Sequence, residues 1–210
     1  MNASFMSQRG FTIFEIVLSL SITMVLMAGL LPAMTSTIRD ARTARATTDM
    51  TDLGLQINQF LTDTGNTLFT IDGTNGAGSK LQLMVSDGDM PGCTTAGAPC
   101  AGGLLSWNRA VDNVGGITDF LERHLVTNNP RGNSANDYPV GAAAWRGPYL
   151  NGPINPDPWG NRYMVNAEAF PAGGNDVIVL SAGKDETVDT IFQANGFATG
   201  GDDLFSLVQN

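Results

Sequence analysis

The feature that most constrains this chain is a long apolar run near its N-terminus, residues 11–33. As an α-helix this run is roughly 35 Å long, which matches the hydrocarbon core of a bilayer. Between Phe11 and Ile38 the only formally charged side chain is Glu15. A carboxylate in hydrocarbon costs at least about 2–3 kcal/mol unless it is neutralised or paired. The sequence therefore predicts a membrane-spanning helix in which Glu15 has a purpose beyond insertion.

A cleavable secretory signal peptide is the first alternative for this segment. Such a peptide has an apolar core of about 7–15 residues and a small-residue, A-x-A-like cleavage site. Here the run is longer and contains Glu15, and Leu26 and Leu31 stand where small residues are required before Ala28 and Ala33. A plain transmembrane anchor fits the length better, but it leaves Glu15 unexplained.

Composition excludes two broad classes of function. Lys and Arg total 11 against 20 Asp and Glu, for a net charge of -9, so the chain lacks the basic surface that nucleic-acid binding requires. His124, the single histidine, lies in the sequence LERHL with no HExxH, CxxC or nucleophile elbow nearby. We expect a surface or packed histidine there, and a protein that is not an enzyme.

Beyond the apolar run, apolar residues continue at three- and four-residue steps from Ile38 to Leu61, which predicts that the helix extends to about Gly65. The pattern predicts a short helix over residues 117–126. It predicts strands over residues 79–85, 161–170, 176–183 and 204–208. The predicted fold class is α+β: a long N-terminal helix, transmembrane and then amphipathic, packed on a small antiparallel β-sheet head.

Arg9 and Gly10, followed by the sequence FTIFE from Phe11 to Glu15, resemble the class III signal of type IV prepilins and pseudopilins. Phe14 departs from the branched residue or proline that is commoner at its position. The resemblance implies a pilin-like fold, cleavage by prepilin peptidase between Gly10 and Phe11, and N-methylation of Phe11. It divides the chain into a leader (1–10), a transmembrane and polymerisation helix (11–33), an amphipathic helix (34–63) and a periplasmic head (64–210).

The same resemblance assigns assembly roles to Glu15, Gly29 and Pro32. In the family, the glutamate is neutralised by the N-terminal amine of a neighbouring subunit, here that of Phe11. Because an unpaired partner is costly, such a pair sets axial register more than it adds stability. Pro32 lacks an N–H and clashes with the carbonyl of Ala28, so we expect the helix to kink or loosen there. The alternative is a kink that a membrane helix simply tolerates.

Membrane orientation can be argued in two ways. Arg39, Arg42 and Arg45 follow the apolar run and only Arg9 precedes it, so a positive-inside count places the C-terminal domain in the cytoplasm. The resemblance implies the opposite, because the family's peptidase acts on a cytoplasmic leader. On that basis we expect a single-pass inner-membrane protein with a periplasmic C-terminal domain, incorporated into a periplasmic filament.

Two further stretches narrow the family. WRGPYL (145–150) and DPWGNRY (157–163) resemble the signature of the major, G-type pseudopilin of type II secretion systems. Prolines fix the turns in both stretches, and Gly160 and Asn161 suit a turn that leads into a strand. We expect the aromatic residues to pack this loop onto the helix: Trp145, Tyr149, Trp159 and Tyr163.

Near the C-terminus an acidic loop carries oxygen ligands that suit Ca²⁺, a hard cation that accepts irregular geometry. The resemblance implies a calcium site formed by Asp185, Asp202 and Asp203, with a backbone carbonyl from Ala182. The loop is longer than the family pattern around residues 190–199. The alternative is a solvated acidic loop.

Cys93 and Cys100 lie in the Gly- and Pro-containing stretch PGCTTAGAPC. Two cysteines without a nearby histidine do not make a zinc site. A disulfide between them is expected if the domain lies outside the cytoplasm, and free thiols are the alternative.

For the whole protein, the resemblance implies a structural subunit of a type II secretion pseudopilus. It would form a homopolymer through its N-terminal helices and assist protein export with minor pseudopilins, prepilin peptidase, an inner-membrane platform protein and a cytoplasmic ATPase. One alternative is a major or minor type IV pilus subunit for adhesion, motility or DNA uptake. Another is a membrane-anchored ligand-binding module, which would gain nothing from Glu15.

Overall fold

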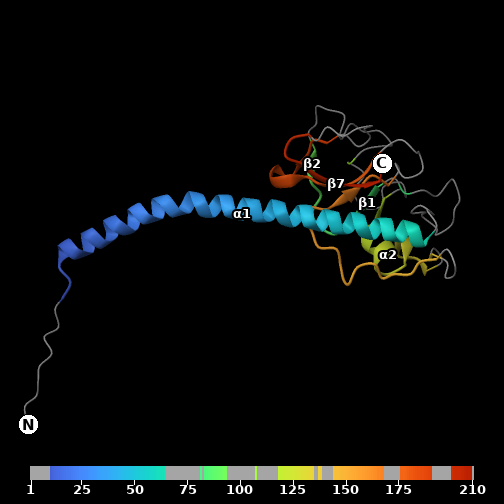
Figure 1. Ribbon diagram of the computed structural model, residues 1–210, viewed down its shortest axis with the longest axis horizontal. Coiled ribbons are helices and arrows are strands. Elements are labelled where there is room, and N and C mark those ends of the chain that lie inside the picture. Colours follow the sequence, from blue (N-terminus) through green and yellow to red (C-terminus); the bar gives the residue numbers. More distant parts are fainter. Residues whose placement is uncertain are drawn as a thin grey trace, which may run out of the picture. The chain divides into compact units, whose positions relative to one another are not determined.

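The computed structural model describes residues 10–64, 81, 83–93, 107, 118–134, 137–138, 144–167, 176–190 and 200–209. The chain divides into two compact units between Ala41 and Arg42, and each is described by itself. The helices and strands follow in the order α1 (Ile13–Asp63), β1 (Leu83–Val85), β2 (Gly92–Cys93), β3 (Thr118–Phe120), α2 (Leu121–Leu125), η3 (Pro130–Gly132), β4 (Met164–Val165), β5 (Val177–Ser181), η6 (Gly183–Asp185), β6 (Thr187–Val188) and β7 (Leu204–Gln209) (Figure 1).

In the first unit, α1 presents apolar side chains that the head does not cover. Every residue from Gly10 to Arg45 is exposed. The helix continues through Pro32, so the predicted loosening at this residue does not interrupt it, and the Thr35 hydroxyl donates to the Pro32 carbonyl at 2.9 Å. Within the described part of the chain, α1 is the one helix long and apolar enough to cross a membrane.

In the second unit, the remainder of α1 supplies one side of the core. Its buried residues recur at the three- and four-residue steps expected of an amphipathic helix: Ala46, Met50, Leu53, Gly54, Ile57, Phe60 and Leu61. Ile38 and Ala41, which continue the same spacing toward the N-terminus, remain exposed. Burial against the head therefore begins at Ala46.

The head is built on a five-stranded sheet in the order β3-β1-β4-β5-β7. The pairs β1–β4, β4–β5 and β5–β7 are antiparallel, as predicted, but β1 and β3 are parallel, so the sheet is mixed. A separate pair, β2 and β6, is also parallel. The α+β class is confirmed, and the purely antiparallel sheet is corrected to a mixed one.

The predicted helix over residues 117–126 is wrong at its start. Thr118, Asp119 and Phe120 form β3 in register with Leu83, Met84 and Val85 of β1, and α2 begins only at Leu121. A short run containing a β-branched and an aromatic residue suits either element, and pairing with a distant strand decides between them. Ile117 lies outside the described residues.

Both faces of the sheet are buried, by different partners. Met84, Val165 and Val179 belong to the cluster that includes Ile57 and Phe60 of α1. The residues that alternate with them on the strands belong to a second cluster around Trp107: Leu83, Val85, Met164, Ile178 and Leu180. The Trp107 indole N–H donates to the Thr190 carbonyl at 2.8 Å. Burial on both faces accounts for the nearly continuous apolar sequence of β5.

Strand β7 lies directly against α1 at Gly54 (Figure 1). A Cβ at Gly54 would lie 3.7 Å from Cγ2 of Val208 and 3.8 Å from Oγ of Ser206, which are ordinary van der Waals distances. Nearby, the Asn58 amide donates to the Val208 carbonyl at 3.0 Å. The helix and this edge strand are thus joined by packing and by a hydrogen bond.

We predict that Gly54→Ala stabilises the head by about 0.5–1 kcal/mol, because the methyl group fits against β7 and alanine favours a helix interior over glycine. Urea unfolding of a fragment comprising residues 35–210 measures this change. Gly54→Leu is the matched control, since its longer side chain reaches into β7 and should destabilise the fragment. Loss of stability in Gly54→Ala would contradict the packing described.

Candidate functional site: the exposed helix and the head that carries it

Glu15 closes a capping box at the start of α1. Its Oε2 atom accepts hydrogen bonds from the backbone N–H and the hydroxyl of Thr12, both at 2.9 Å. The Glu15 N–H donates to the Thr12 hydroxyl oxygen at 3.3 Å. This reciprocal arrangement satisfies N–H groups that have no partner within the helix. The spacing Thr-x-x-Glu was a readable signal for it, which our sequence reasoning on Glu15 missed.

The capping box supplies hydrogen bonds to Glu15 but no compensating charge. Both bonds go to Oε2, and neither Glu15 oxygen forms an ion pair with any described residue. The carboxylate is therefore oriented within the single subunit while its negative charge remains to be neutralised from outside.

The surroundings of Gly10 and Gly29 are open. A Cβ placed at either residue meets no described atom within 4 Å. Packing within the single subunit therefore does not explain glycine at either position. The predicted roles, peptidase cleavage after Gly10 and an assembly role for Gly29 beside Pro32, remain predictions. Phe11, at the predicted cleavage site, is also exposed.

The DPWGNRY stretch is organised by Asp157, a buried carboxylate that sequence reasoning did not single out. Its Oδ1 accepts from the N–H groups of Trp159 and Asn161 at 3.0 and 2.8 Å, and its Oδ2 accepts from the Ser181 hydroxyl at 2.6 Å. Gly160 has a φ of 100°, a conformation that favours glycine. An aspartate at the start of a Pro- and Gly-containing turn was the available signal.

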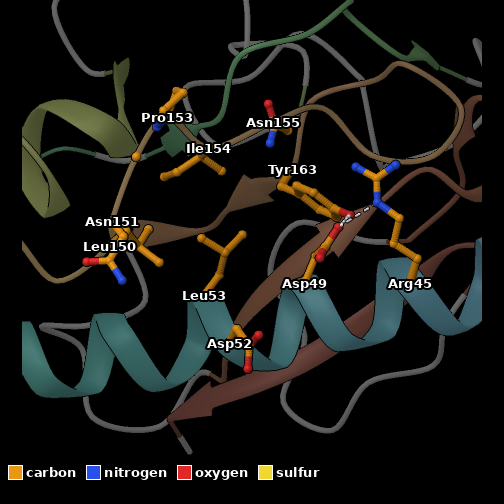
Figure 2. Close-up of a pocket in the computed structure, with 11 residues that line it drawn as sticks. Arg45, Asp49, Asp52, Leu53, Leu150, Asn151, Pro153, Ile154, Asn155 and Tyr163 are labelled. Atoms are coloured by element: carbon orange, nitrogen blue, oxygen red, sulfur yellow. Dashed lines mark hydrogen bonds and ion pairs between the residues drawn. The ribbon is translucent and has the colours of Figure 1, made fainter.

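Beyond that turn, Tyr163 connects the head to α1. Its hydroxyl donates to Oδ2 of Asp49 at 3.1 Å, and Nε of Arg45 lies 3.3 Å from the same oxygen (Figure 2). Burial, reinforced by the charge of Asp49, raises the pKa of Tyr163, so the phenol remains protonated and able to donate. The predicted contact of this motif with the helix is thus made by a defined hydrogen bond.

The WRGPYL stretch covers the C-terminal end of α1. The Tyr149 ring packs edge-on against Phe60 with centroids 5.8 Å apart, and the Trp145 indole N–H donates to the His124 carbonyl at 2.7 Å. A Cβ at Gly147 would overlap the Trp145 ring, so this position needs glycine. Three of the four predicted aromatic residues pack as expected, whereas Trp159 is half-buried and outside both core clusters.

His124 is packed, not exposed. Its Nε2 lies 2.9 Å from Oδ2 of Asp119, and its Nδ1 lies 2.6 Å from the Tyr138 hydroxyl. Burial lowers the pKa of His124, although Asp119 opposes this effect. A neutral ring that donates from Nε2 and accepts at Nδ1 satisfies both contacts. His124 is thus the packed histidine that was one of the two expected alternatives.

Asp119 is the centre of the same network. It also accepts hydrogen bonds from the Arg123 guanidinium at 2.7 Å and the Arg131 N–H at 2.6 Å. Burial alone would raise the pKa of Asp119, but these bonds and those from His124 lower it to about 2. The network ties β3, α2 and the loop that follows into one polar unit.

We predict that the head loses stability as the pH falls below about 6.5. The unfolded chain gains a proton on His124 there, while the buried ring resists one, so protonation favours unfolding. Between pH 7.5 and 5.5 the free energy of unfolding should fall by an amount on the order of 1 kcal/mol. Urea unfolding of residues 35–210 at both pH values measures it. The His124→Gln variant should be less stable at pH 7.5, but its free energy of unfolding should change little between the two pH values. If the free energy of unfolding fell equally with pH in both proteins, the pH dependence could not be assigned to His124.

The acidic loop brings the predicted calcium ligands near one another through backbone contacts. Asp202 accepts from the Lys184 N–H at 2.8 Å, and Oδ2 of Asp203 accepts from the N–H groups of Asp189 and Thr190 at 2.9 and 2.6 Å. Oδ1 of Asp203 is buried and has no hydrogen-bond partner in the described part of the chain. A buried carboxylate oxygen without a donor is the kind of atom that a cation satisfies.

Close backbone approaches shape the same loop. A Cβ at Gly183, where φ is 69°, would overlap the Asp202 carbonyl, and one at Gly200 would overlap Asp189. Burial raises the pKa of Asp185, and the charge of Asp202 adds to the rise. Within the described ranges, no three Asp, Glu, His or Cys side chains converge closely enough to hold a metal ion. Calcium binding therefore remains a prediction.

The other predicted residues of this region are only partly described. Ala182 is buried between β5 and η6. Cys93 lies in β2, which pairs with β6, and Cys100 is outside the described residues. The disulfide therefore remains a prediction.

Comparison with known proteins identifies part of the head. A family model described as "Type II secretion system (T2SS), protein G" matches residues 129–195. The match includes the WRGPYL and DPWGNRY stretches, β4, β5 and the start of the acidic loop. Neither the curated proteins nor the solved structures compared with the chain gave a significant match. The predicted resemblance to the major pseudopilin is thus confirmed over these residues.

Proposed function

We propose that this protein is a structural subunit of a type II secretion pseudopilus, which polymerises through its N-terminal helix and thereby drives protein export. One observation carries the proposal: a head that matches protein G is joined to a helix whose apolar side chains are exposed. Exposed large apolar side chains include Phe11, Ile13 and Phe14, each at least 75% accessible. A membrane or neighbouring copies must cover such a surface.

In this proposal, prepilin peptidase removes residues 1–10 and N-methylates Phe11. The new amine at Phe11 then neutralises Glu15 of a neighbouring copy. The capping box orients the carboxylate through Thr12 without neutralising it, so the charged pair becomes complete only on assembly. The chain spans the inner membrane once, with the head in the periplasm, and minor pseudopilins and the platform protein are its assembly partners.

We predict that Glu15→Leu inserts into the membrane and is processed but yields few or no filaments. The more exact variant is Glu15→Gln, because glutamine retains the capping hydrogen bonds and loses only the charge. Filaments sheared from cells and chain retained in the membrane fraction are measured together. Assembly of Glu15→Gln at the wild-type level would show that charge pairing is not required and would overturn this part of the proposal.

We further propose that Asp185, Asp202 and Asp203, with the carbonyl of Ala182, hold Ca²⁺ in the acidic loop. The buried Oδ1 of Asp203 and the tight backbone approaches at Gly183 and Gly200 support a cation there. Carboxylate and carbonyl oxygens are the ligands that this ion prefers. Bound calcium would offset repulsion among carboxylates and hold the loop against the end of β5.

For this site we predict that calcium raises the melting temperature of residues 35–210 and that chelation reverses the rise, because binding to the folded state stabilises it. Asp202→Ala should abolish the calcium response. Asp137→Ala, outside the loop, should keep it. An identical melting curve with calcium and with chelator would count against the site.

A further inference from the structure

A groove lies between α1 and the loop over residues 150–155, away from the predicted calcium loop. Its volume is about 410 Å³, and Asp49, Asp52 and Leu53 line it from α1. Leu150, Asn151 and Asn155 line it from the loop (Figure 2). Arg45 of α1 also lines it, so the cavity combines a guanidinium, carboxylates, amides and apolar carbon.

The two carboxylates in this groove are in different states. Asp49 is engaged by Arg45 at 3.3 Å and by the Tyr163 hydroxyl at 3.1 Å, while Arg45 also donates to the Pro156 carbonyl at 3.5 Å. Asp52 is exposed and has no hydrogen bond or ion pair with any residue that the structure describes. The groove therefore retains one uncompensated negative charge beside its apolar lining.

The same helix carries arginines that lack such compensation. Arg39, Arg42 and Arg45 follow one another at three-residue steps, and only Arg45 has an ion pair in the described part of the chain. The residues four positions beyond Arg39 and Arg42 are Thr43 and Ala46, which offer no carboxylate. Both arginines are exposed, and an arginine pairs an apolar stem with a planar charged head.

We propose that this groove binds Arg42 of a second copy of the chain, with the guanidinium on Asp52 and the stem against Leu53 and Leu150. The inference rests on the proposed function, since it concerns contacts between copies. Charge complementarity supports it: each copy presents one unpaired acid in a groove and an unpaired arginine about 15 Å earlier along the helix. Arg42 is nearer to the groove in sequence than Arg39. Pairing through Arg42 therefore requires a smaller displacement of the second copy along the axis of α1.

The second copy is displaced in the same direction in this contact as in the proposed pairing of Phe11 with Glu15. Pairing of Phe11 with Glu15 joins an earlier residue of one copy to a later residue of its neighbour. Pairing of Arg42 with Asp52 does the same. Both contacts shift the second copy in the same direction along the helix, by about 6 Å for Phe11 with Glu15 and by about 15 Å for Arg42 with Asp52, so they join one copy to different neighbours in the filament.

The test uses charge reversal in the full-length chain expressed with its secretion system. Asp52→Arg and Arg42→Asp should each reduce filament yield at least about fivefold, because each places like charges at the contact. The double variant, Asp52→Arg with Arg42→Asp, should recover most of the yield. Failure of the double variant to recover, or normal yield from either single variant, would overturn the pairing.

Asp40 provides a matched control, because it is an exposed acid on α1 that does not line the groove. Asp40→Arg should assemble normally and should not rescue Arg42→Asp. An equal loss of filament yield in Asp40→Arg would indicate a general charge effect and overturn the proposal.

A photo-crosslinker at position 52 should capture a peptide containing Arg42 of another copy. Capture only of a different protein would also overturn it. Normal wild-type and impaired Glu15→Gln assembly, measured in parallel, separate failure of this contact from failure of the proposed function.

Discussion

The rest of the structure depends on a mismatch between the apolar surface of α1 and the surface that the head can bury. Burial on the head begins at Ala46, whereas large apolar side chains such as Phe11, Leu20 and Leu31 are exposed. Leaving such side chains in water forfeits about 25 cal/mol for each Å² of apolar area. The single subunit has no means to recover this free energy. Its fold therefore requires cover from a bilayer, from other helices, or from each in turn.

The second half of α1 is held within the head itself. Three kinds of contact do this: the apolar cluster around Ile57 and Phe60, the hydrogen bond from Tyr163 to Asp49, and the close packing of β7 at Gly54. Tyr163 is itself positioned by the turn that Asp157 organises. The family signature thus acts mainly as a structural device that connects the loop, the sheet and the helix.

The parts of this protein that could be predicted from sequence are those encoded locally. The membrane-length run and strand β5 follow from continuous apolar stretches, and the stripe that includes Met50 and Ile57 follows from helical periodicity. The Thr12 capping box was also encoded locally and could have been recognised. Strand β3 could not be separated from α2, because three residues become a strand only through pairing with β1, far away in sequence.

Buried polar networks were the least predictable feature, for a related reason. His124 meets Asp119 across the junction of β3 and α2, and it meets Tyr138 only after the chain returns through a loop. Nothing in the local pattern distinguishes this histidine from one on a surface. The same holds for the contact of Asp49 with Tyr163, the last residue of DPWGNRY, whereas Arg45 pairs with Asp49 locally at a spacing of four residues on α1. Such contacts depend on tertiary geometry, which spacing along the chain does not determine.

The capping role of Glu15 in the single subunit is compatible with the assembly role proposed for it. Capping uses Oε2, so the residue contributes to helix initiation in the isolated subunit while its charge is still available. A carboxylate already oriented by Thr12 loses less conformational freedom when an ammonium group arrives. The cap also keeps the acid at the helix N-terminus, where the helix dipole favours negative charge. In the proposed assembly, the capping box would thus hold Glu15 in position for the contact that neutralises its charge.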